Sequence, residues 1–220
     1  MDRKQLRSEI VKTLADIGDP VLAGKGFKRK KRTLRYQRKL LSGNHWVIID
    51  FRLPRYSDDP SLCHLKLVIG ASFPEVNAMA VHLVDGDPQL GGFFPDVTYA
   101  FTVGECGPER AFKDWRPENI DDLHNKMQDM INYLLQFGTP FLDKYQTSSS
   151  LVQGYLNGEY LFMRNRPLAV TVIAAALCTS QNNIAKEIAD RELGTLLGIR
   201  RRYAILFERL NALTGGATVE

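Results

Sequence analysis

The sequence of 220 residues has few cysteines, no long hydrophobic run and no secretory leader at its start. Cys63, Cys106 and Cys178 lie far apart without a C-x-x-C pair, which favours reduced thiols over a disulfide framework or a structural zinc site. The longest apolar segment, 167–178, falls short of the roughly 18 to 20 residues that a membrane span needs. The N-terminus is charged from its second residue and has no apolar leader region. These features predict a cytoplasmic protein with no membrane segment.

Acidic residues are missing from residues 25–39, which contain nine Lys or Arg. Residues 1–40 hold thirteen basic and four acidic side chains, a net charge of +9, whereas the rest of the chain carries −5. A run of like charge attracts phosphate groups or an acidic protein. Alternatively, it solvates the edge of a sheet and discourages aggregation there. The candidate binding residues in this segment are Lys28, Arg29, Lys31, Arg32, Arg35 and Arg38.

Aromatic residues form a second candidate surface. Phe93 and Phe94 lie in a Gly- and Pro-rich stretch, and Phe112 and Trp115 follow it. An exposed aromatic cluster is typical of protein-binding surfaces, because aromatic side chains bury a large area at low entropic cost. The alternative is that these side chains pack a loop and the following helix onto a sheet.

The sequence contains no assembled catalytic or metal-binding signature. None of its four histidines has metal-ligand spacing, although strand parity could bring His45 and His64 together. Cys106 lies in a turn, but no histidine is placed by sequence to activate it. No glycine pattern matches a nucleotide-binding loop. We therefore favour a non-catalytic protein without a metal or cofactor. An enzyme is the third hypothesis, and it would require a deep pocket where histidine, cysteine and carboxylate converge.

Hydrophobic periodicity in the first half of the chain predicts one helix followed by strands. Apolar residues at steps of three and four indicate a helix over residues 3–23. A turn at residues 42–44 separates the first two predicted strands and suggests a hairpin. The predicted strands are residues 27–40, 45–53, 62–73 and 97–103.

The second half changes to helical periodicity, with a long helix predicted from Pro117 to about residue 142. Four amphipathic segments follow and indicate two helical hairpins: residues 148–157, 167–179, 182–193 and 199–213. We predict an α+β fold with a mainly antiparallel sheet, packed by the N-terminal helix and the long central helix. The predicted divisions are an α+β domain at 1–145, helical hairpins at 146–213 and a frayed tail at 214–220.

Three motifs are distinctive: GFKRK followed by Thr33, FPEV after a strand, and FLDKY at the end of the long helix. In these motifs and their order the chain resembles the uncharacterised bacterial domain-of-unknown-function 4304 family. The resemblance spans roughly residues 3–145 and extends more loosely to the helices behind them. It implies a compact α+β domain with appended helices, and it supplies no activity, substrate or catalytic residue.

A charge-polarised domain without catalytic parts favours a binding function. The leading hypothesis is a bacterial protein-interaction module, of the immunity or antitoxin type, with an acidic protein as its partner. The alternative is nucleic-acid binding through residues 25–39, with Tyr36, Trp46 and Tyr56 as groups on which bases stack.

Overall fold

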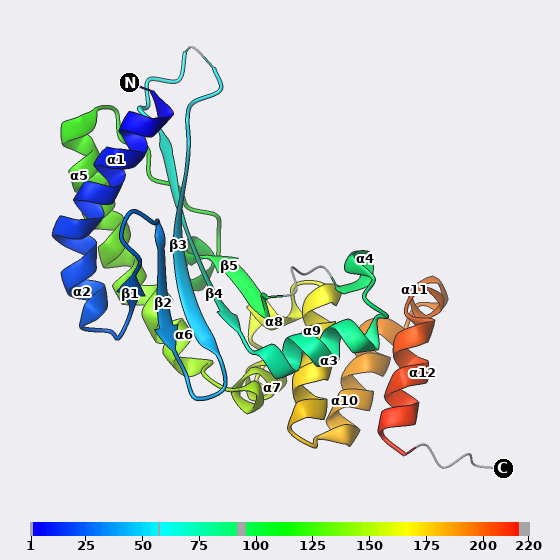
Figure 1. The fold of residues 1–220 in the computed structure, drawn as a ribbon. Helices are drawn as coiled ribbons and strands as arrows, with labels where there is room; N and C mark the ends of the chain where they lie inside the picture. Colours follow the sequence, from blue (N-terminus) through cyan, green and yellow to red (C-terminus); the bar gives the residue numbers. More distant parts are fainter. Residues whose placement is uncertain (1, 57, 92–95, 216–220) are drawn as a thin grey trace. The chain divides into compact units, whose positions relative to one another are not determined.

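The computed structural model describes residues 2–56, 58–91 and 96–215 and has the predicted α+β fold (Figure 1). Within these residues, one antiparallel sheet has five strands in the order β1-β2-β3-β4-β5. The chain divides into two compact units, each built from two separate stretches. The sheet unit comprises Met1–Ala71 and Ala100–Lys144, and the helical unit comprises Ser72–Tyr99 and Tyr145–Glu220.

This division differs from the predicted boundary at residue 145, because residues 72–99 belong to the helical unit. The reason is a helix that the sequence analysis did not predict, α3 (Pro74–Leu83). Its Val76 and Ala80 are buried, and it packs against α9 (Arg166–Cys178). The apolar surface of α3 therefore completes the core of the helical unit. Of the predicted frayed tail, residues 216–220 lie outside the described residues.

The strands contain one correction to the predicted elements. They are β1 (Lys28–Arg29), β2 (Arg35–Lys39), β3 (Asn44–Arg52), β4 (His64–Ser72) and β5 (Tyr99–Thr102). The single strand predicted over residues 27–40 is instead a pair, because the chain reverses at residues 30–34. There Arg32 adopts a left-handed backbone conformation with φ of 64°, and the Thr33 amide donates to the Lys30 carbonyl oxygen at 3.1 Å. The basic run thus folds back on itself as the β1–β2 hairpin.

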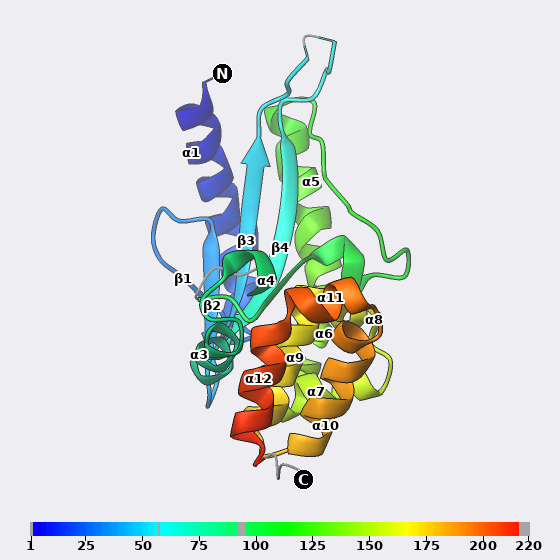
Figure 2. The same ribbon diagram turned by 90° about the vertical axis from the view of Figure 1, so that its right-hand side faces the viewer.

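Two long helical segments of the sheet unit share one design. The first is α1 (Arg3–Thr13), the π-helical turn η1 (Leu14–Gly18) and α2 (Asp19–Ala23). The second is α5 (Ile120–Tyr133), the π-helical turn η3 (Leu134–Gly138) and α6 (Thr139–Lys144). They confirm the helices predicted at 3–23 and 117–142, although the second begins at Ile120, where the Asn119 side chain caps the Asp122 amide. In Figure 2, β3 and β4 lie in front of α5.

Each π-helical turn of the sheet unit, η1 and η3, lies immediately before a residue–proline pair. Proline lacks the amide that an α-helix requires at that position, and Pro20 and Pro140 follow η1 and η3 by two residues. The amides of Asp19 and Thr139 donate to carbonyl oxygens five residues earlier, at Leu14 and Leu134. The wider turn lets each helix continue past its proline.

The helical unit is assembled around α9. Its other helices are α3, α4 (Pro88–Gly91), α7 (Ser148–Leu156), α8 (Tyr160–Met163), α10 (Asn182–Ala189), η4 (Asp190–Gly194), α11 (Leu197–Arg202) and α12 (Ala204–Leu213). Every side chain of α9 from Ala169 to Ala176 is buried, since α3, α7 and α10 pack around the helix. Full burial of Val170 or Ile173 stabilises the fold by about 1.5–3 kcal/mol each.

The described residues contain no helix that is both long and apolar enough to cross a membrane.

Candidate interaction surface

The basic β1–β2 hairpin divides its cations between two faces, and Arg29 points inward. Strand pairing sets Arg29 opposite Tyr36, and both side chains reach Asp19 at the start of α2. The Arg29 guanidinium donates to both Asp19 carboxylate oxygens, at 2.7 and 2.6 Å, and to the Thr33 carbonyl oxygen at 3.0 Å. With its side chain only 5% exposed, Arg29 ties the hairpin to the helix layer and is not available to a partner.

Asp19 receives a third hydrogen bond, from the Tyr36 hydroxyl at 2.7 Å. Burial alone would raise the pKa of Asp19, but the hydrogen bonds from Arg29 and Tyr36 outweigh it and lower that pKa. Burial, reinforced by the hydrogen bond to Asp19, raises the pKa of Tyr36. Asp19 is therefore held as the carboxylate and Tyr36 as the neutral phenol.

Arg38 also points inward, with its side chain 15% exposed. It forms an ion pair with Asp143 of α6 at 2.6 Å and lies over the ring of Phe27, 4.7 Å from its centroid. It also hydrogen-bonds to Nδ1 of the buried His45 at 2.9 Å. Because a guanidinium only donates, the His45 Nδ1 acts as the acceptor. Arg38 thus holds both helix and strand, as Arg29 does.

The remaining basic side chains of residues 25–39 are exposed. Strand alternation places Lys28, Arg35 and Lys39 on the face opposite Tyr36. Lys30, Lys31 and Arg32 lie in the turn between the strands, and Lys25 precedes them. Among the described residues, no ion pair joins any of these seven cations to a carboxylate. We call this set of seven the outer basic face.

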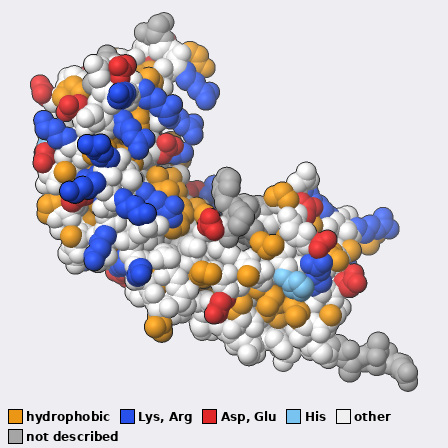
Figure 3. All heavy atoms as spheres, in the orientation of Figure 1, with side chains coloured by type: hydrophobic (Ala, Val, Ile, Leu, Met, Phe, Trp, Pro, Cys, Tyr) orange, Lys and Arg blue, Asp and Glu red, His pale blue; other side chains and the backbone are white. Residues whose placement is uncertain are grey.

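The charge of the outer basic face is part of a wider asymmetry. The sheet unit carries twenty-one basic and fifteen acidic residues, a net charge of +6, and the helical unit carries eight and ten, a net −2. In Figure 3, Lys and Arg side chains gather over the part of the sheet unit that carries α1, β1 and β2 (Figure 1). A surface of this kind attracts acidic partners over about one Debye length, roughly 8 Å at physiological salt.

The aromatic candidates do not form one exposed patch among the described residues. Trp115 is buried at 6% exposure, where it pairs with Leu65 of β4 and packs edge-on against Tyr133, with ring centroids 5.8 Å apart. Trp115 therefore packs its loop and the helix α5 onto the sheet and does not contribute to an exposed surface. Phe112 is 61% exposed, and Phe93 and Phe94 lie outside the described residues.

His64 lies between two carboxylates, an arrangement that the sequence analysis missed. Its Nε2 is 2.7 Å from Asp59 and its Nδ1 is 3.6 Å from Asp114. Hydrogen bonds from the Ser61 side chain and amide, and then from His64, lower the pKa of Asp59 to about 2. The D-x-S spacing is a local turn signal, but Asp114 comes from a distant segment. His45 and His64 thus have different partners, and the described residues contain no metal-ligating cluster.

Two of the three cysteines, Cys63 and Cys178, have a raised pKa. Burial raises the pKa of Cys63 to about 11, and burial followed by the charge of Glu75 raises the pKa of Cys178. Both thiols are therefore poor nucleophiles at neutral pH.

Comparison with models of known protein families, with curated proteins and with solved structures finds no match for this chain. The resemblance to the domain-of-unknown-function 4304 family accordingly stays a prediction.

Proposed function

We propose that this protein is a non-catalytic interaction module of the bacterial cytoplasm, of the immunity or antitoxin type, that binds an acidic protein through its outer basic face. The observation that carries the proposal is the division of the hairpin: Arg29 and Arg38 are held by carboxylates of α2 and α6, while seven neighbouring cations have no acidic partner among the described residues. Unpaired cations on a firmly anchored hairpin are preorganised for an acidic surface, which reduces the entropic cost of binding.

The placement of the aromatic residues favours a protein over a single-stranded nucleic acid. Binding of single strands relies on aromatic side chains that stack on bases. Tyr36 and Trp46 are 1% and 4% exposed, so neither ring face is open to a base. Tyr56 is exposed but lies outside the hairpin. The outer basic face thus has positive charge, but Tyr36 and Trp46 present no exposed aromatic ring there on which a base could stack.

The proposal is tested by measuring fluorescence anisotropy of a labelled poly-glutamate peptide, a labelled DNA duplex and a labelled single-stranded RNA, each titrated with the full chain. The test variant combines Lys28→Gln, Lys31→Gln and Arg35→Gln. The matched control combines Lys4→Gln, Lys12→Gln and Arg55→Gln, which removes the same charge from exposed positions outside the hairpin. We expect the peptide to bind at physiological salt and the test variant to weaken it by about tenfold or more.

The control variant should bind the peptide within about twofold of the unchanged protein, because only general attraction is reduced. An equal loss in both triple variants would reject the outer basic face as the site. If the duplex binds more tightly than the peptide and its affinity falls steeply as the salt concentration rises, the partner is a nucleic acid and not an acidic protein.

A further inference from the structure

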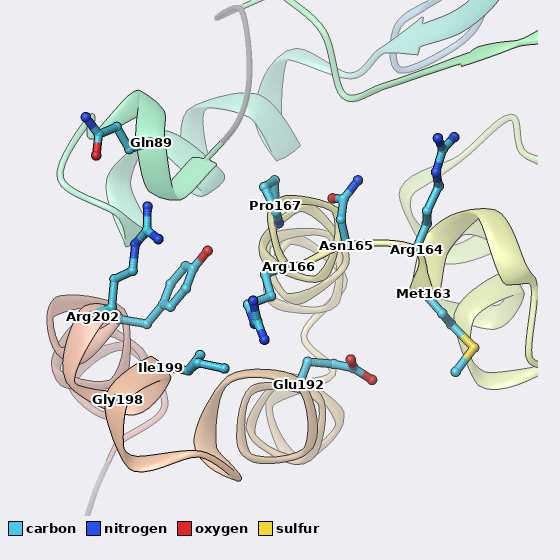
Figure 4. A pocket seen from close by; sticks show the side chains of 11 residues that line it. Gln89, Met163, Arg164, Asn165, Arg166, Pro167, Glu192, Gly198, Ile199 and Arg202 are labelled. Carbon is cyan, nitrogen blue, oxygen red and sulfur yellow. The ribbon is translucent and has the colours of Figure 1, made fainter.

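Whereas the basic hairpin belongs to the sheet unit, a cavity of about 680 Å³ lies in the helical unit. It opens between α4, the N-terminal end of α9, η4 and α11 (Figure 4). This volume is in the range of pockets that take small organic ligands. Its apolar lining comes from Met163, Pro167 and Ile199.

The cavity lining contains Arg164, Arg166 and Arg202, and in Figure 4 the Arg164 side chain extends away from the other two. Arg166 is the first residue of α9 and Arg202 the last of α11, so two separate helices bring them to one cavity. In Figure 4, the Arg202 side chain extends toward α4, which carries Gln89, whereas Arg166 extends toward Ile199. Both side chains are exposed, and among the described residues no ion pair joins either to a carboxylate.

Tyr203 fixes the wall beside these arginines. It is 3% exposed, and its hydroxyl donates to the Leu90 carbonyl oxygen at 3.3 Å, which ties α4 to the junction of α11 and α12. Burial raises the pKa of Tyr203, while the nearby charges of Arg202 and then Arg166 oppose that rise. Arg166, Arg202 and Tyr203 thus line the same cavity, and the charges of both guanidinium groups act on the Tyr203 hydroxyl.

The single carboxylate of the lining, Glu192, is already engaged. It accepts a hydrogen bond from the Tyr155 hydroxyl and pairs with Arg191 at 3.4 Å. Arg191 is not among the lining residues, and its charge offsets that of Glu192. The amide side chains of Gln89 and Asn165 also line the cavity. The N-terminal end of α9, a helix of 13 residues, adds the positive end of its dipole.

We propose that this cavity binds a small phosphomonoester. Two unpaired guanidinium groups match the charge of a phosphate dianion and donate to its oxygens in bidentate fashion. The apolar lining leaves room for the organic part of the molecule. The site is independent of the outer basic face and of the acidic protein proposed to bind there.

The test uses phenyl phosphate as the probe and benzoate as its monoanionic counterpart. Both carry one aromatic ring, so the comparison isolates the doubly charged phosphate. Each is titrated at pH 7.5 into the full ¹⁵N-labelled chain, and amide shifts are followed by two-dimensional NMR. We expect saturable shifts around the cavity with a Kd of about 1 mM or tighter for phenyl phosphate, and at least tenfold weaker binding of benzoate.

The variants are Arg166→Gln and Arg202→Gln, with Arg201→Gln as the matched control. Arg201 is exposed and adjacent to Arg202 but does not line the cavity. Each lining variant should weaken phenyl phosphate by about tenfold, and the control should stay within about twofold. Absence of saturable shifts at the cavity up to about 20 mM, equal losses in all three variants, or benzoate binding as tightly as phenyl phosphate would each overturn the proposal.

Discussion

The two faces of the β1–β2 hairpin carry the same residue types but differ in what those residues contact. On the inner face, Arg29 and Arg38 are bound to Asp19 and Asp143, and each also lies against an aromatic ring. On the outer face, Lys28 and Lys39 are exposed to solvent. The inner cations are thus tied to carboxylates of other elements, whereas of the outer ones Arg35 lies over the Trp46 ring, 5.6 Å from its centroid, without a carboxylate partner among the described residues. The outer cations contribute mainly to the surface potential.

The largest expected effect comes from removing an inner cation. Arg29→Ala deletes the bidentate pair and leaves Asp19 with only the Tyr36 hydroxyl. We expect the free energy of unfolding to fall by about 3 kcal/mol, since one half-buried charge loses its partner. Urea denaturation followed by circular dichroism measures this change. Lys28→Ala, one residue earlier and exposed, should change it by less than about 0.5 kcal/mol. If both variants lowered the free energy of unfolding equally, the inner and outer faces of the hairpin would not differ in their contribution to stability.

A smaller effect should come from the helix side of the same contact. A Cβ on Gly18 would lie 2.7 Å from the Tyr36 hydroxyl oxygen, so Gly18→Ala must displace the group that bonds Asp19. We expect a loss of about 1–2 kcal/mol in urea denaturation, because the site is overpacked. Gly24→Ala is the control, since its Cβ would have ordinary clearance at 3.4 Å and its φ of −61° suits alanine. A neutral Gly18→Ala would show that Tyr36 moves without cost.

The smallest effect is on the pH dependence of stability. The pKa of Asp19 is lower in the folded protein than its ordinary value of 3.8. The stability that this carboxylate provides is therefore present above that ordinary value and is lost as the pH falls through the folded one. The Asp19 side chain is 39% exposed, so solvent screens part of the effect. Urea midpoints measured between about pH 6 and pH 2.5 should fall more for the unchanged protein than for Asp19→Asn. Parallel curves would contradict this assignment.

Most of the helices could be predicted from sequence because their apolar stripes are regular. The segments 148–157 and 167–179 match α7 and α9 within one residue at each end. The helix α3 was not predicted because it follows almost directly on the apolar strand β4. The change from the two-residue spacing of a strand to the 3.6-residue spacing of a helix is hard to recognise in one continuous apolar segment. Pro74 at its first position was the available signal.

The division of the basic hairpin could not be predicted from sequence. Which cations point inward depends on the register of β1 against β2, and that register depends on the reversal at Arg32. Asp19 and Asp143, which hold the inner arginines, come from helices on either side of the strands in the chain. Nothing local to residues 25–39 identifies these partners.

A sequence signal for the shared helix design was nevertheless present. Residues 14–22 read LADIGDPVL and residues 134–142 read LLQFGTPFL, so both match the pattern L-x-x-Φ-G-x-P-Φ-L, where Φ is apolar. Each copy forms a π-helical turn that ends at its glycine. The glycine makes room for a close neighbour, the Tyr36 hydroxyl at Gly18 and Val103 at Gly138. The pattern therefore predicts both the interruption and the tight packing.

The interleaving of the two units along the chain has a consequence for synthesis on the ribosome. The sheet unit needs α5 and α6, which are made after the segment 72–99 has already emerged. That segment must wait with the apolar side of α3 uncovered until α9 is translated, about 5 to 20 seconds later at synthesis rates of roughly 5–20 residues per second. No single cut releases either unit whole, so the core of the helical unit stays incomplete until α9 and the helices that follow it have been made.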